Sequence, residues 1–207
     1  GNSGGVRPKA IITDTDGHWL VKFHHTYDHK NMGEMEYDYN KAAKQCGIDV
    51  PEFKLMEGKY FAVKRFDIEN DVRLHVLTAS ALLNEPISPP KMDYHSLLQL
   101  TGYLTQSPKA VEQQFRRMTF NVYAHNMDDH ARNFSFICRE GTWSLAPAYD
   151  LTNDDTLDEH ATTINFKGIP TDEDLISVGT NIRISRARCL QIMEEVREGT
   201  KELSIYF

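Results

Sequence analysis

The sequence lacks the features that would anchor it in a membrane or hold it together through disulfide bonds. No apolar run approaches the ~20 residues of a membrane-spanning helix, and no signal peptide is visible at the start. The 207 residues include only three cysteines, Cys46, Cys138 and Cys189. This odd, widely spaced set indicates reduced thiols, as in a cytoplasmic protein, rather than a disulfide framework or a paired-cysteine zinc site.

The chain also lacks an excess of basic residues. Its 23 lysines and arginines face 30 acidic residues, which gives a formal net charge of −7. Wrapping nucleic acid requires a basic surface that neutralises phosphates, so we do not expect this chain to bind DNA by itself. The arginines at 183, 186 and 188 are expected to decorate the exposed face of a helix. We find no internal repeat and no low-complexity segment, and the length allows one domain or two small lobes.

What the sequence does contain is a distinctive set of acids and amides. Asp128 is followed by Asn133 in the run His125-Asn-Met-Asp-Asp-His-Ala-Arg-Asn-Phe134, and Asp150 follows a short apolar stretch. An acid, four residues, an asparagine and then a later acid is the phosphoryl-transfer pattern of protein kinases. In that pattern the first acid receives the substrate's proton, and the other two residues hold Mg²⁺.

Around this motif the periodicities predict strands first and helices later. Apolar runs flank an Asp16-Gly17 turn, which predicts a hairpin, and alternation places Lys22 on the face opposite Trp19 and Val21. Residues 34–46 show a helical apolar stripe, and residues 51–67 offer further strand. From about residue 71 the pattern becomes helical, with starts at Asp93 and at Ser107-Pro108, followed by a hairpin around Glu140-Gly141. Two more helices are expected, one after Thr171 and one over 187–196 that ends before Gly199.

These patterns predict an α+β, bilobal, protein-kinase-like fold. Residues 1–70 would form a small strand-rich N-lobe with a glycine loop, one helix and a hinge near Asp67. Residues 71–207 would form a larger helical C-lobe that carries the Asp128 motif and the metal-binding Asp150.

Five motifs, in the expected order, resemble the HipA-type serine/threonine kinase family, the toxins of type II toxin–antitoxin pairs. They are Gly4–Lys9, Val21–Phe23, Lys64–Asp67, Asn126–Ser135 and Leu145–Leu151. The resemblance covers nearly the whole chain, and it implies an enzyme that uses ATP and Mg²⁺ to phosphorylate a serine or threonine of a protein substrate.

The resemblance also implies roles for individual residues. Asp128 would be the catalytic base, Asn133 and Asp150 would bind Mg²⁺, and Lys22 would contact the ATP phosphates with Glu36 as its partner. The remaining nucleotide-binding positions would be Gly4, Gly5, Val6, Arg7, Pro8 and Lys9 over the phosphates, the backbone of Lys64, Arg65 and Phe66 at adenine, and His130, Ala131, Arg132 and Tyr149 along the site. Ser3 is a candidate regulatory phosphosite, although it lies one place nearer the glycines than the family pattern has it.

Partners are implied only by the resemblance. They are a helix-turn-helix antitoxin, contact with DNA through that antitoxin alone, and aminoacyl-tRNA synthetases as candidate substrates. The family also carries an N-terminal subdomain ahead of the glycine loop, which in some relatives is a separate small protein. Its absence from this sequence is expected to reflect a split system or a trimmed fragment.

Two other functions stay open at this stage. The chain could be a catalytically silent kinase relative that binds an antitoxin partner. Alternatively, the residues His125, Asp128, Asp129 and His130 could form the metal centre of a phosphohydrolase, since His and Asp bind transition metals. The second alternative leaves Asn133 and Lys22 without a role.

Overall fold

The computed structural model describes residues 8–23, 31–85, 91–154 and 156–207. Its first layer is a four-stranded antiparallel sheet of β1 (Lys9–Asp14), β2 (Gly17–Lys22), β3 (Phe53–Met56) and β4 (Tyr60–Lys64), in the order β1-β2-β4-β3. We call this sheet the small lobe. The hairpin predicted at Asp16-Gly17 is confirmed, since Asp14 pairs with Gly17 at its end.

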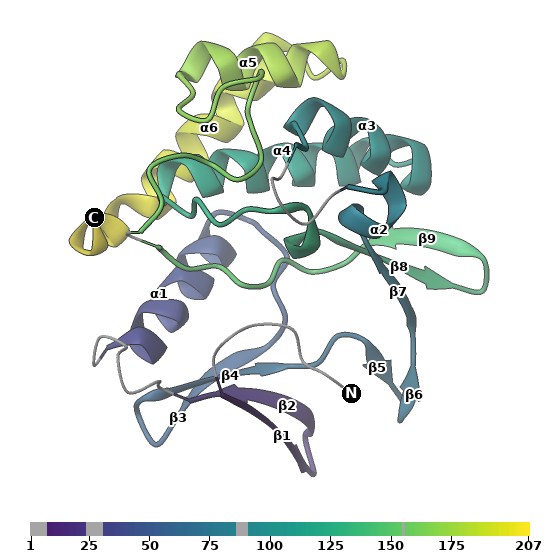
Figure 1. The fold of residues 1–207 in the computed structure, drawn as a ribbon, viewed down its shortest axis with the longest axis vertical. Helices are drawn as coiled ribbons and strands as arrows, with labels where there is room; N and C mark the ends of the chain where they lie inside the picture. The colour runs from purple at the N-terminus through teal and green to yellow at the C-terminus, as the bar shows by residue number, and fades with distance from the viewer. Residues whose placement is uncertain (1–7, 24–30, 86–90, 155) are drawn as a thin grey trace.

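The single helix that follows β2, α1 (Met32–Gln45), lies between the sheet and the rest of the protein (Figure 1). It contacts β3 and β4 on one side and α6 on the other. The apolar stripe predicted for this helix is buried, with Tyr39 fully inaccessible and Met35, Ala42 and Cys46 nearly so. Those residues pack in the main core of the protein, whereas the sheet has a small core of its own around Trp19, Val21 and Ala62. The helix therefore contacts the sheet while its apolar stripe belongs to the main core.

Short strands, rather than helix, follow residue 67. They are β5 (Ile68–Glu69), β6 (Val72–Arg73) and β7 (His75–Thr78), so the expectation that helical structure begins at about residue 71 is wrong for this segment. The strand β7 pairs with β8 (Ser135–Arg139), which pairs in turn with β9 (Thr142–Leu145). Because the partner of β7 lies some sixty residues later in the sequence, no local sequence pattern predicts this strand. The predicted boundary between residues 70 and 71 falls at the tip of the β5–β6 hairpin.

Helices form the other layer, which we call the large lobe together with the β7–β9 sheet (Figure 1). They are α2 (Ala79–Leu83), α3 (Tyr94–Thr105), α4 (Pro108–Tyr123), α5 (Asp172–Asn181) and α6 (Arg186–Thr200), with short 3₁₀ segments η1 (Ala131–Asn133) and η2 (Lys201–Tyr206). The predicted starts are confirmed: Asp93 and Ser107 cap α3 and α4 through their side chains, and Pro108 occupies the first turn of α4. The part of the chain that the structure describes contains no helix long and apolar enough to cross a membrane.

The last helix departs from its prediction at its end. It continues through Gly199 to Thr200. A side chain at position 199 would collide with the sulfur of Cys46, so this position requires a glycine. The glycine here serves close packing of α6 against the end of α1 rather than helix termination. Leu190 is 48% exposed, and the buried face is formed by Cys189, Ile192, Met193 and Val196.

Candidate functional site

Lys22 stands at the centre of the candidate site. Its ammonium nitrogen lies 2.9 Å from Oε2 of Glu36 on α1 and 2.7 Å from Oδ1 of Asp150. The strand β2 places Lys22 on the face opposite the small core, as the alternation predicted, and the ion pair predicted with Glu36 is present. Burial by itself would lower the pKa of Lys22, but the two carboxylates outweigh burial and raise it well above its ordinary value. The lysine is therefore held as a cation between the two lobes.

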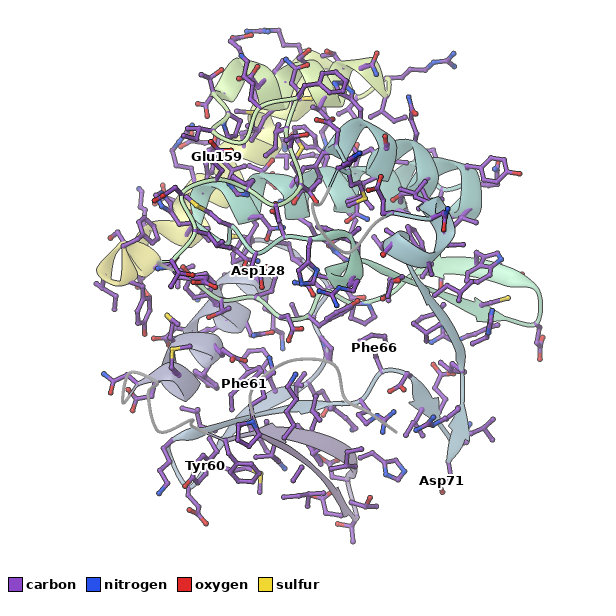
Figure 2. The ribbon with its side chains drawn as sticks, viewed as in Figure 1. Tyr60, Phe61, Phe66, Asp71, Asp128 and Glu159 are labelled. Carbon is purple, nitrogen blue, oxygen red and sulfur yellow. The ribbon has the colours of Figure 1, made fainter. Side chains whose placement is uncertain are left out.

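A cleft of about 230 Å³, open to solvent, extends from this ion pair between the small lobe and the segment that carries Asp150. Its walls include predicted nucleotide-site residues and several that sequence reasoning missed, among them Leu20, Asn40, Phe61 and Val63. Figure 2 shows Asp128 on the large-lobe side of this region, with Phe61 and Phe66 nearer the sheet.

The segment Lys64–Asp67 leads out of β4 along this cleft. The backbone N–H of Lys64 donates to Glu52 O at 2.8 Å, and that of Arg65 donates to His18 O at 2.8 Å. Those two donors are thus used within the small lobe. The ring of Phe66 stacks on Tyr149, with centroids 5.6 Å apart, and the side chain of Arg65 pairs with Asp67.

Tyr149 connects the segment that carries Asp150 to the Asp128 loop, by which we mean residues 125–134. Its hydroxyl lies 2.6 Å from Ser135 Oγ and donates to the carbonyl of Arg132 at 2.7 Å. Asp150 follows with φ at +52°, in the left-handed region that few non-glycine residues adopt. Burial would raise the pKa of Asp150, but Lys22 outweighs that effect and lowers it below its ordinary value. Asp150 is thus held ionised.

Asp128, in the Asp128 loop, has a different environment from that of Asp150. Its side chain is 48% exposed, and its Oδ1 is 3.9 Å from His130 Nε2, beyond hydrogen-bond distance. Burial, followed by the charges of Asp154, Asp129 and Asp150, raises the pKa of Asp128 above its ordinary value despite the opposing effect of His130. The side-chain amide of Asn133 donates to the backbone carbonyl of Asp128 at 2.8 Å, which directs its nitrogen into the loop.

Asp129, the next residue, points into the protein. It is 1% exposed. Its carboxylate accepts hydrogen bonds from Tyr94 Oη at 2.7 Å and the backbone of Thr162 at 3.1 Å, and it lies 3.0 Å from His160 Nδ1. This burial could not be recognised from the sequence, because the partners lie more than thirty residues away.

The phosphohydrolase alternative requires His125, Asp128, Asp129 and His130 to converge on one metal. Asp129 is instead saturated by interior donors, and the ring of His125 stacks on Phe207. Within the described ranges, no group of three or more His, Cys, Asp or Glu side chains is arranged to hold a metal ion. The geometry does not support that alternative.

Several predicted positions remain to be placed. Lys9 lies in β1 and lines the cleft, and Pro8 precedes it, its carbonyl accepting from Phe23 N. Ala131 is buried in η1, Arg132 is exposed and His130 is partly exposed. The positions Ser3, Gly4, Gly5, Val6 and Arg7 lie outside the described residues.

Arg186 and Arg188 lie in the first turn of α6, as predicted for the arginine cluster, but Arg183 is in the turn that precedes this helix, so the prediction is wrong for Arg183. Arg186 pairs with Glu173 and Arg188 with Glu112. In the acidic segment that begins at Asp154, the residues Thr156, Asp158 and Glu159 are exposed.

Comparison with known folds supports a kinase-like architecture. HipA of Shewanella oneidensis MR-1, solved with HipB and its operator DNA, has a TM-score of 0.77 and 18% identity, and the match covers 100% of this chain and 59% of HipA. The proinflammatory kinase CtkA of Helicobacter pylori has a TM-score of 0.63 and 16% identity over 95% of this chain and 90% of CtkA. The chain thus spans about three fifths of the HipA chain that it matches.

Among curated proteins, no sequence matches this chain. The family of HipA-like C-terminal domains matches it over residues 1–203, which include the Lys22 ion pairs, the Asp128 loop and Asp150. By that match, the protein belongs to the HipA-like C-terminal domain family.

Proposed function

We propose that this protein is an ATP- and Mg²⁺-dependent protein kinase that phosphorylates a serine or threonine of a protein substrate. The observation that carries the proposal is the position of Lys22, held by Glu36 at 2.9 Å and by Asp150 at 2.7 Å on the wall of an open cleft. A lysine fixed by a helix glutamate, beside a later aspartate, is the arrangement that protein kinases need before phosphoryl transfer. Membership in the HipA-like family and the kinase-like fold support the same conclusion.

Asp128 is the proposed catalytic base. A base must reach the substrate hydroxyl and must be unprotonated, and the 48% exposed carboxylate of Asp128 is open to an incoming side chain. Its raised pKa, caused first by burial, makes it a stronger proton acceptor than an ordinary aspartate. The hydroxyl proton would pass to this carboxylate as the hydroxyl oxygen bonds to the γ-phosphorus, while the bond from that phosphorus to the β,γ-bridging oxygen breaks and ADP leaves.

Asn133 and Asp150 fit the donor chemistry of Mg²⁺, which prefers oxygen ligands. The amide nitrogen of Asn133 is used by the backbone of Asp128, so its oxygen is the atom left for a cation. The Lys22 contact uses Oδ1 of Asp150, which leaves Oδ2 for the same purpose. When bound, Mg²⁺ would neutralise charge on the phosphates.

The adenine is proposed to lie against the Phe66–Tyr149 pair. Leu20 and Val63 would cover its face, because both line the same cleft. Since the N–H groups of Lys64 and Arg65 are used within the small lobe, the N–H of Phe66 becomes the proposed donor to adenine. Gly4–Lys9 would cover the phosphates.

The partners are proposed from the same family. A HipA structure that contains HipB and operator DNA motivates a helix-turn-helix antitoxin partner, with DNA bound only through it. We propose a cytoplasmic location, a protein substrate of the aminoacyl-tRNA synthetase class, and a separate N-terminal subdomain protein as a further partner.

The test is transfer of labelled γ-phosphate from Mg²⁺·ATP to the chain itself and then to proteins of a lysate. We compare the native chain with Asp128→Ala and with Asp158→Ala, a matched control on an exposed loop residue. Transfer by the native chain and the control, but not by Asp128→Ala, is the expected result, and the labelled residue would show whether Ser3 accepts phosphate.

Nucleotide binding separates the remaining outcomes. Binding of Mg²⁺·ATP without transfer, even after addition of the proposed N-terminal subdomain protein, would contradict the kinase and favour the silent antitoxin-binding module. Absence of binding would contradict the nucleotide site itself.

A further inference from the structure

The C-terminal segment contacts α1, the Asp128 loop and the segment that follows Asp150. The hydroxyl of Tyr206 donates to Asp38 Oδ2 on α1 at 2.6 Å, and the carbonyl of Tyr206 accepts from Asn153 Nδ2 at 2.9 Å. The ring of Phe207 stacks on His125, with centroids 3.9 Å apart and an interplanar angle of 8°. In Figure 1 the C-terminus lies beside α1, next to the segment that leads away from Asp150.

Each of these contacts falls close in sequence to a residue of the site. Asp38 is two residues from Glu36, Asn153 is three residues after Asp150, and His125 is three residues before Asp128. Tyr206 and Phe207 lie beyond residues 1–203, the part of the chain that the family matches. The C-terminal contacts are therefore a feature of this chain that family membership does not supply.

The orientation of α1 decides whether Glu36 meets Lys22. Glu36 is 4% exposed on the buried face of the helix, which also carries Tyr39, and the Tyr39 hydroxyl donates to the carbonyl of Ala124 in the large lobe. Asp38 is two residues from Glu36, and at about 100° per residue it points to a different side of the helix. Tyr39 and Tyr206 therefore hold α1 to the large lobe from two directions, which resists rotation about the helix axis.

We propose that Tyr206, supported by Phe207, is a positioning residue that fixes α1 in the rotation at which Glu36 holds Lys22. The contact of Tyr206 with Asn153 and that of Phe207 with His125 also hold the C-terminal segment against the chain after Asp150 and against the start of the Asp128 loop. The consequence for phosphoryl transfer rests on the proposed function, whereas the effect on α1 does not.

The variant that isolates this role is Tyr206→Phe. It removes the hydroxyl that reaches Asp38 and keeps the ring, which packs 6.1 Å from the ring of Tyr39. Tyr103→Phe is the matched control. It removes a tyrosine hydroxyl in the same way, but from a side chain on α3 that is 78% exposed. Asp38→Asn keeps an oxygen acceptor for Tyr206, whereas Asp38→Ala removes it.

The first readout is amide hydrogen exchange of α1 in the full chain, which needs no activity. Loss of one hydrogen bond to a carboxylate should speed exchange of the α1 amides near Asp38 by about tenfold. We expect this change in Tyr206→Phe and Asp38→Ala, little change in Asp38→Asn, and none in Tyr103→Phe. The double variant Tyr206→Phe/Asp38→Ala should be no worse than either single variant, because both remove the same contact.

The second readout is Mg²⁺·ATP affinity and the rate of phosphoryl transfer. Faster exchange in α1 together with weaker binding or slower transfer supports the proposal. Unchanged exchange in Tyr206→Phe overturns it, and so does faster exchange with native binding and transfer. If the native chain neither binds nor transfers, the proposed function fails, and faster exchange in Tyr206→Phe still supports the structural role of Tyr206.

Discussion

Two adjacent aspartates of the Asp128 loop, Asp128 and Asp129, have opposite environments, one open to solvent and the other buried in the protein. Asp128 is 48% exposed and stands outside hydrogen-bond distance of His130. Asp129 is 1% exposed, and its oxygens receive hydrogen bonds from Tyr94 and Thr162. An acid whose oxygens are already saturated by the fold serves structure, whereas one that still faces solvent is available for chemistry.

The largest expected effect is the loss of phosphoryl transfer when Asp128 is changed. In Asp128→Asn, phosphoryl transfer should fall by about 10²–10⁴-fold, the usual contribution of a general base. The unfolding free energy should stay near the native value, because the side chain is half exposed. Transfer kinetics and urea unfolding on the same preparation check both parts. Native-like transfer by a folded Asp128→Asn protein would contradict the assignment.

The same substitution at the buried neighbour Asp129 should lower the free energy of unfolding instead. Asp129→Asn places an amide NH₂ or a weaker acceptor against donors from Tyr94 and Thr162. We expect a loss of about 2–3 kcal/mol in the free energy of unfolding, as for a buried polar group left unsatisfied. Urea unfolding measures it. A native stability for this variant, together with lost activity, would show that the comparison between the two acids is wrong.

Asp174 tests whether other buried acids follow the same rule. Its carboxylate accepts hydrogen bonds from Lys167, Asn165 and the backbone and hydroxyl of Thr171, at 2.8–2.9 Å. These bonds, with the one from Lys167 first, lower the pKa of Asp174 below its ordinary value. We expect Asp174→Asn to cost about 1–2 kcal/mol at neutral pH, as loss of a helix N-terminal cap does.

The pH dependence of that loss has a definite sign. A lowered folded-state pKa means that ionised Asp174 stabilises the native state above the ordinary carboxyl pKa, and that this stabilisation disappears as the pH falls through the folded-state pKa. The stability difference between the native chain and Asp174→Asn should therefore narrow in acid. A difference that widens as pH falls would contradict the assignment.

The smallest expected effect is a shift in the pKa of Asp128 when a neighbouring charge is removed. After burial, the charge of Asp154 is among the influences that raise its pKa. Removing that charge in Asp154→Asn should lower the pKa of Asp128 and move the acid limb of the kcat/KM profile to lower pH. Asp158→Asn is the control that should leave the profile in place. A shift to higher pH would show that Asp154 acts in another way.

Much of the site could be predicted because its signals are local. Alternation along β2 put Lys22 on the face opposite Trp19 and Val21, and the helical pattern of residues 34–46 included Glu36, whose pairing with Lys22 was implied by the family resemblance. The hairpin after Asn133 was readable from Glu140-Gly141, which connect β8 and β9. Other features depended on distant partners. The strand β7 pairs with β8, and Gly199 packs against Cys46, so neither could be inferred from neighbouring residues.

The sequence by itself determined which chemical groups this protein carries and in what order: a strand lysine, a helix glutamate, the Asp128–Asn133 spacing and the later Asp150. Only the tertiary structure decided that Asp128 is exposed and Asp129 buried, which backbone amides of Lys64 and Arg65 are already used, and how the C-terminal segment meets α1. The physical reason is range. Periodicity and turn chemistry act over a few residues, whereas the burial and hydrogen-bond saturation of a side chain depend on residues that only folding brings together.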